Sequence, residues 1–179
     1  MGGTYKKFLT LFTIVLAVGL LSTNESKAQL PDGAFGIGSN FSAGVPALSG
    51  QYAISEAVDL ALNLGYTSNS SNNDISNTTV TTSQTQIGLG LRYFFVDNKR
   101  IDPFFGLSFG YGMSDTGGSF DPTTLGLNLM FGGQTQIAEN FFIYIATGVM
   151  YSSTEVSDNS SNSTISLGTT SVGAIIYFK

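Results

Sequence analysis

Residues 58–66, Val-Asp-Leu-Ala-Leu-Asn-Leu-Gly-Tyr, carry an apolar or aromatic side chain at every second position, with mostly small or polar side chains between them. A period of two is typical of a β-strand whose two faces meet different surroundings. A second stretch repeats this alternation through Ile101, Phe105, Leu107, Phe109 and Tyr111. About ten such residues are enough to cross a bilayer as a tilted strand. The pattern therefore predicts membrane-spanning β-structure.

The same alternation divides the chain after Gln29 into eight predicted strands. They cover residues 34–42, 47–55, 58–67, 83–95, 101–113, 123–132, 141–151 and 164–178. Short connections at 56–57, 96–100 and 138–140 alternate with long ones at 68–82, 114–122 and 152–163, the short first outward loop at 44–46 excepted. This order predicts an all-β fold: an eight-stranded antiparallel up-and-down transmembrane β-barrel with short periplasmic turns and longer extracellular loops.

A soluble lipocalin-like barrel is the competing fold, because it also alternates but exposes its polar face to water. That polar face would need charged side chains such as Lys and Glu. The polar positions here are instead small and uncharged: Thr124, Gly126 and Asn128 in one strand, and Gly106, Ser108, Gly110 and Gly112 in another. Such residues favour a narrow, crowded lumen inside a membrane barrel.

The amino terminus has the pattern of a secretory signal peptide. Lys6 and Lys7 precede an apolar run at 8–21, and a polar stretch closes on Ala28. The run is shorter than the roughly 20 residues that a spanning helix needs. We expect a cleaved signal peptide at 1–28 and one barrel domain at 29–179. Residue 29 is Gln and not Cys, so it offers no acceptor for lipid attachment.

Composition excludes several classes of function. The whole chain has a net charge of −5, and removal of residues 1–28 leaves 4 basic and 11 acidic side chains, a net charge of −7. Nucleic acid is therefore not an expected partner, because its phosphates need clustered Lys and Arg. The chain has no Cys and no His. Disulfides, thiolate chemistry and a Ser-His-Asp triad are thus unavailable.

Aromatic residues gather near the predicted strand ends, where outer-membrane barrels carry their two interfacial girdles. We assign to these girdles Tyr66, Tyr93, Phe94, Phe95, Phe104, Phe105, Phe131, Phe141, Phe142, Tyr151, Tyr177 and Phe178. The alternative for any one of them is the general preference of aromatic residues for strands.

With these features the chain resembles the small outer-membrane barrels typified by OmpX and the transmembrane domain of OmpA. The final strand, with Val172, Ala174, Ile176 and Phe178, is similar to their carboxy-terminal aromatic signal, although Lys179 follows here. The resemblance implies a location in the outer membrane of a Gram-negative-type bacterium. It also implies assembly by the barrel-assembly machinery and contact with outer-membrane lipid and lipopolysaccharide.

Enzymes of similar architecture, the lipid A palmitoyltransferase and the omptin proteases, rely on a His that this chain lacks. A carboxylate pair could replace it in acid–base chemistry, but the acidic residues are dispersed. They fall in predicted loops (Asp74, Asp115, Asp121, Glu155, Asp158) or near turns (Glu56, Asp97, Asp102, Glu139), and Asp59 alone lies well inside a strand pattern. We therefore predict no enzyme, no cofactor and no metal site.

Arg92 is the one basic residue within a predicted strand. Facing lipid it would cost about 2–4 kcal/mol near the bilayer midplane, so we place it in the lumen, paired with Asp59 if their levels agree. The other predicted lumen-lining residues are Gln51, Asn63, Gln86 and Asn128. These residues either stabilise the barrel interior or set the ion preference of a pore.

The outward loops at 67–83 and 152–166 are dense in Asn, Ser and Thr. Such segments cannot form a core, but on a hairpin they could bind a surface ligand. We expect a non-enzymatic, monomeric protein with a structural, envelope-integrity or adhesion-type role. The alternative is a porin-like narrow channel or transporter for small solutes or apolar molecules.

Overall fold

The computed structural model describes residues 32–42, 45–73, 78–95, 101–117, 120–157 and 160–178. The predicted signal peptide at 1–28 lies outside these residues, as do Asp74, Asp97, Asp158 and Lys179. Among the described residues, no helix is long and apolar enough to span a membrane.

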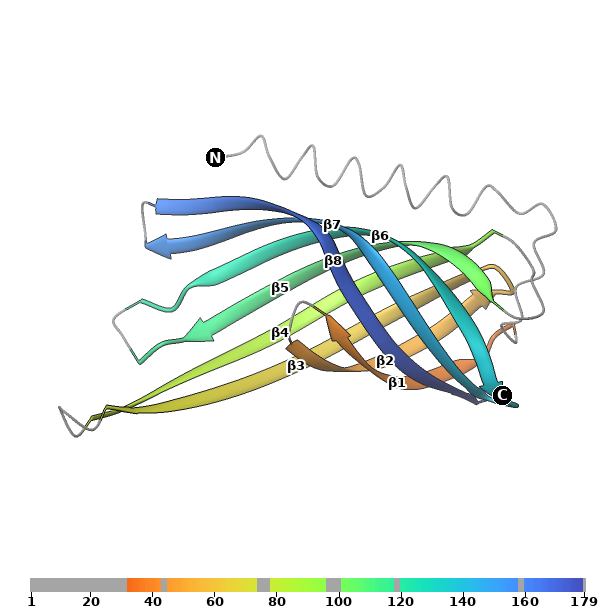
Figure 1. Cartoon of the computed structure of the whole chain (residues 1–179), viewed down its shortest axis with the longest axis horizontal. Helices are drawn as coiled ribbons and strands as arrows, with labels where there is room; N and C mark the ends of the chain where they lie inside the picture. Colours follow the sequence, from red (N-terminus) through yellow and green to blue (C-terminus); the bar gives the residue numbers. More distant parts are fainter. Residues whose placement is uncertain are drawn as a thin grey trace.

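Eight strands form a closed barrel in which each pairs with its neighbours in the chain and β1 pairs with β8 (Figure 1). Their bounds are β1 Phe35–Ser42, β2 Val45–Ser55, β3 Val58–Asn73, β4 Thr78–Phe94, β5 Asp102–Asp115, β6 Thr123–Ala138, β7 Phe141–Ser157 and β8 Ser160–Phe178. All pairs are antiparallel. The predicted fold class is confirmed.

The strands are tilted, as closure of a barrel requires. Partners traced from Ile165 on β8 through Tyr151, Leu127, Phe109, Leu89, Leu62, Gly50 and Ile37 return to β8 at Ile176. Following paired residues once around the barrel therefore leads from position 165 to position 176 of β8, toward the end that holds the C terminus. Such a stagger accompanies a strand tilt of roughly 35–45°.

The two faces of the wall differ in polarity as the alternation predicts. Leu60, Leu62 and Leu64 point outward and are 40, 44 and 53% exposed, whereas Asp59, the neighbour of Leu60 in the chain, is fully buried. Each of the eight strands exposes large apolar side chains on the outside. A barrel with this belt is stable only when lipid, and not water, surrounds it.

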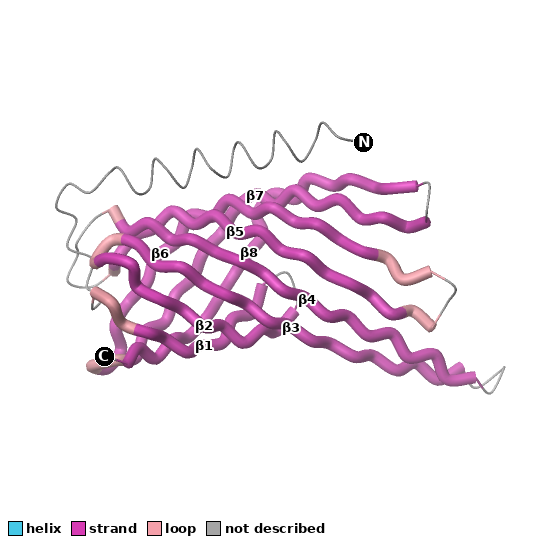
Figure 2. The backbone as a smooth tube through the Cα atoms, turned by 180° about the vertical axis from the view of Figure 1, so that it is seen from behind, coloured by secondary structure: helices cyan, strands magenta, loops and turns pink. Residues whose placement is uncertain are grey.

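Two of the three predicted long outward loops, at 68–82 and 152–163, are wrong in extent, because most of their residues continue the strands. β3 and β4 stay in register to Asn73↔Thr78, and β7 and β8 stay paired, with two register shifts, to Ser157↔Ser160. Cross-strand hydroxyl bonds, such as Ser70 to Thr81 at 3.0 Å, replace apolar packing there. The hairpins consequently extend well beyond the outward ends of β1 and β2 (Figure 2). Glu155 therefore lies within β7, and Asp115 ends β5.

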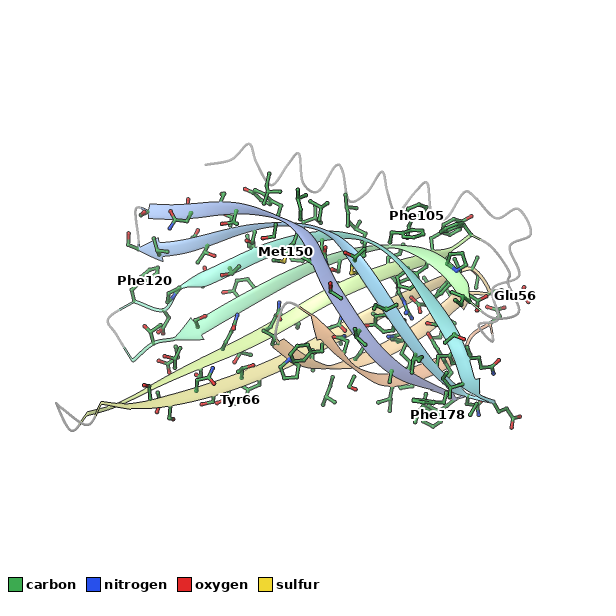
Figure 3. All side chains as sticks on the ribbon, viewed as in Figure 1. Glu56, Tyr66, Phe105, Phe120, Met150 and Phe178 are labelled. Carbon is green, nitrogen blue, oxygen red and sulfur yellow. The ribbon has the colours of Figure 1, made fainter. Side chains whose placement is uncertain are left out.

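The girdle assignment is wrong for four aromatic residues. Phe94, Phe104, Phe142 and Tyr177 are at most 2% exposed and point into the barrel. Each is adjacent in sequence to another aromatic residue, and adjacent side chains of a strand face opposite ways. Outside, Phe105, Phe131 and Phe178 are 57, 51 and 51% exposed. Phe105 and Phe178 lie at the end that holds the C terminus, as a periplasmic girdle requires (Figure 3).

Candidate functional site in the barrel interior

An ion pair lies inside the barrel at the periplasmic end of β3 and β4. Asp59 and Arg92 are register partners on these strands, and they are 0 and 5% exposed. Nε of Arg92 donates to Oδ1 of Asp59 at 3.0 Å, and Nη2 of Arg92 pairs with Oδ2. Asp59 and Arg92, two of the six residues predicted to line the lumen, thus form a bidentate ion pair.

Gln51 and Tyr177 complete a polar cluster with this ion pair. Nη2 of Arg92 also donates to Oε1 of Gln51 at 2.6 Å. The hydroxyl of Tyr177 lies 2.9 Å from both Oε1 of Gln51 and Oδ2 of Asp59, which are alternative acceptors for its one proton. The polar cluster of Gln51, Asp59, Arg92 and Tyr177 therefore joins β2, β3, β4 and β8.

Aromatic rings surround the polar cluster. The guanidinium carbon of Arg92 lies 5.4, 5.2 and 4.9 Å from the ring centroids of Phe94, Phe104 and Tyr144. Phe142 packs edge-on against Tyr177 at 5.4 Å. Cation–π attraction is strongest where water is absent, and it offsets part of the cost of burying the charge. We call the polar cluster and these four rings the plug.

Above the plug lies a cavity of about 320 Å³. On β4 it runs from Gln84 down to Arg92, so its floor is the upper side of the plug. Gln51, Asn63, Gln86, Arg92 and Asn128 all line it, whereas Asp59 lies below within the plug. Asn63, Gln86 and Asn128 thus line the cavity alone, Asp59 is enclosed in the plug, and Gln51 and Arg92 belong to both.

The Asn side chains in the cavity wall form few hydrogen bonds with other side chains. Asn40 donates to Asn63 at 2.6 Å, and Thr169 donates to Asn128 at 3.3 Å. Asn40 and Asn63 come from β1 and β3, so their bond reaches across β2. Both contacts cross-link the barrel, and both leave donors and acceptors unused.

The aromatic part of the plug is what sequence reasoning missed. Tyr177 was assigned to the interface, yet its hydroxyl binds the buried ion pair. A signal existed in the adjacent aromatic pairs Phe104–Phe105 and Tyr177–Phe178, because one member of such a pair must face inward.

Acidic side chains are sparse in the described interior, and Asp59 is fully buried there. In the part of the chain that the structure describes, no three His, Cys, Asp or Glu side chains gather as metal ligands would. The Asp59 carboxylate is enclosed and neutralised by Arg92, so it is poorly placed to exchange protons with a substrate.

A closed eight-stranded barrel with an apolar outer belt and a polar interior defines an integral outer-membrane protein. The chain belongs to the family of the outer membrane protein beta-barrel domain, whose model matches residues 13–174. The prediction of a small outer-membrane barrel is therefore confirmed, and with it the outer-membrane location. A closer kinship with OmpX or OmpA stays a prediction.

Three solved structures show a similar fold. Neisserial surface protein A, NspA, has 20% identity and a TM-score of 0.46, with 81% of this chain and 94% of that chain covered. A major outer membrane protein from Thermus thermophilus has 13% identity and a TM-score of 0.46 over 81% and 98% of the two chains. CarO2 of Acinetobacter baumannii has 11% identity and a TM-score of 0.45 over the same shares. No curated protein matches the chain.

Proposed function

We propose that this chain is a non-enzymatic structural protein of the outer membrane whose outward hairpins bind extended segments of other proteins at the cell surface. One observation carries the proposal: among the described residues, two strand edges on the outward side have no neighbouring strand. β1 pairs with β8 only as far as Ser42↔Ser171, while β8 continues to Ser160. β2 pairs with β3 only as far as Ala47↔Gly65, while β3 continues to Asn73.

These edges extend beyond the membrane. A tilted strand crosses the hydrocarbon with about 9–11 residues. β1 and β2 have 8 and 11 residues, whereas β8 has 19 and β3 has 16. The outer parts of β3 and β8 therefore stand in water above the short β1–β2 hairpin, on either side of the place that longer β1 and β2 strands would occupy (Figure 2).

The edges also lack most of the usual protection against pairing, although β8 carries a bulge at Gly168. Natural edge strands carry Lys, Pro or inward charges that discourage addition of another strand. Residues 66–73 and 160–170 contain neither a charge nor a Pro. Their exposed main-chain N–H and C=O groups are complementary to a polypeptide in the β-conformation, since strand addition takes its affinity from main-chain hydrogen bonds.

Several further expectations belong to this proposal. Export through a signal peptide at 1–28, assembly by the barrel-assembly machinery and a monomeric state in lipid and lipopolysaccharide are consistent with it. The absence of His and Cys from the chain and the enclosure of Asp59 support a role without catalysis. The plug argues against the alternative of a narrow channel or transporter, because bulky side chains occupy the lumen below the cavity.

The test uses the refolded protein in micelles and a short synthetic peptide of alternating Thr and Val. We expect saturable binding of this peptide by fluorescence anisotropy. The same peptide with N-methyl groups on alternate amides should not bind, because it lacks main-chain donors.

Two hairpin deletions locate the binding site. Removal of residues 68–83 and 153–163 takes away most of the β3 edge and the outer part of the β8 edge, and should strongly weaken peptide binding. Removal of residues 114–122 shortens the β5–β6 hairpin, whose strands have neighbours on both sides, and should leave binding intact. Equal binding by the two deletion variants, or by the two peptides, would refute the proposal.

A further inference from the structure

We propose that the cavity above the plug is a binding site for a small uncharged saccharide. It is separate from the strand edges, and it lies inside the wall between the plug and the outward end of the barrel. Its volume of about 320 Å³ is at the lower end of the range of small-molecule sites. Three features of its described lining point to this ligand class: the glycines, the amide side chains and the lack of an unpaired charge.

Glycines keep the cavity open, and at two of their positions packing does not require a glycine. Gly88, Gly110 and Gly126 are register partners on β4, β5 and β6, and all three face the cavity. A Cβ on Gly110 would meet nothing closer than 3.5 Å, and one on Gly126 nothing closer than 3.9 Å. Larger side chains would therefore fit at Gly110 and Gly126, and they would fill the space, whereas a Cβ on Gly88 would lie 3.2 Å from the backbone oxygen of Phe109.

Amide groups in the wall have hydrogen-bonding capacity to spare. The bond from Asn40 Nδ2 to Asn63 Oδ1 leaves Oδ1 of Asn40 and Nδ2 of Asn63 available. Gln86 lines the same space, and its Nε2 is the nearest atom to a Cβ on Gly110. A ligand with several hydroxyl groups can both donate to and accept from such amides.

The cavity has no unpaired charge among its described lining residues that would select an ion. Arg92 is the one charged residue of this lining, and Asp59 neutralises it from below. Met130, Met150 and Tyr144 supply apolar surface near the floor. A neutral molecule with hydroxyl groups on its rim and C–H groups on its faces matches this lining better than a phosphate, an amine or an alkyl chain.

The test measures binding to the folded protein in a detergent without a sugar headgroup. The probes are glucose, N-acetylglucosamine and maltose, with glucose 6-phosphate and glucosamine as charged comparisons. We expect saturable calorimetric binding of at least one neutral sugar and no comparable binding of the charged ones. Failure of all three neutral sugars to bind, or equal binding of a charged comparison, would overturn the proposal.

Matched leucine substitutions locate the site. Gly110→Leu fills the cavity and should abolish sugar binding. Gly50→Leu adds the same side chain where a Cβ meets only Phe35 at 3.9 Å, on the outer face, and should preserve binding. A heat-modifiable gel shift confirms folding of each variant. Unchanged affinity in Gly110→Leu would overturn the proposal, while binding of the Thr–Val peptide by that variant keeps this outcome separate from the test of the strand edges.

Discussion

Glycine has opposite roles in the two halves of the barrel interior. In the periplasmic half, a Cβ on Gly173 would overlap the ring of Tyr144, and one on Gly132 would lie 2.7 Å from Phe104. In the outward half, a Cβ on Gly110 or Gly126 would find room. The first glycines let bulky side chains close the lumen, and the second leave a space that nothing in the described chain fills. One residue type therefore marks a packed region and an open region of the same lumen.

The largest effect should come from removing one partner of the buried ion pair in the packed half. Asp59→Ala leaves Arg92 buried without a counter-charge, and we expect a loss of about 3–5 kcal/mol in folding free energy. Urea-dependent folding into lipid vesicles measures this loss.

The double variant Asp59→Leu with Arg92→Met provides the control, since it removes both charges. It should recover most of the stability. A single variant as stable as the wild type would show that the plug does not depend on this pair.

A charge on the outer wall should cost somewhat less. Leu127→Arg places a guanidinium against lipid, and we expect a loss of about 2–4 kcal/mol by the same vesicle assay. Asn128→Ser changes the neighbouring inward side chain, which accepts a bond from Thr169, and should cost less. Equal losses would mean that the inside and outside faces of β6 are assigned wrongly.

Replacing a glycine by alanine should change the folding free energy with opposite sign in the two halves of the barrel interior. Gly173→Ala forces a Cβ against Tyr144 and should destabilise the barrel by about 1–3 kcal/mol. Gly110→Ala has room and should stabilise it by about 0.5–1 kcal/mol, because glycine weakens a strand interior. Similar losses in both variants would abolish the distinction between the two halves.

The smallest effect belongs to the hairpin that rises above the membrane. Ser70→Ala removes an exposed hydroxyl bond to Thr81, and we expect a change within about 0.5 kcal/mol. Amide hydrogen exchange should accelerate only in the outer part of β3 and β4. A global loss of stability would show that this hairpin is part of the core.

Sequence alternation predicted the ring of eight strands and the inward face of Asp59 and Arg92, because a period of two determines the face. That the two residues lie level with each other follows from the β3–β4 register of the folded chain. It did not predict the length of the outward hairpins, since Ser, Thr and Asn suit both a loop and a cross-strand hydroxyl ladder. The prediction that Phe94 and Phe104 belong to the girdles followed the clustering of aromatic residues at strand ends. The alternation of inward and outward side chains along each strand instead places both residues inside the barrel. The two roles of glycine depend on distances to partners such as Tyr144, and those distances come only from the folded chain.

Single-channel recording from the refolded protein in a planar bilayer tests the closed plug most directly. Folding is first verified by the heat-modifiable gel shift. We predict a silent bilayer for the wild type, because the polar cluster and its rings occupy the lumen below the cavity. Steady openings of the folded wild type, with an ion preference that changes in Arg92→Ala, would contradict this account and indicate a pore lined by that residue.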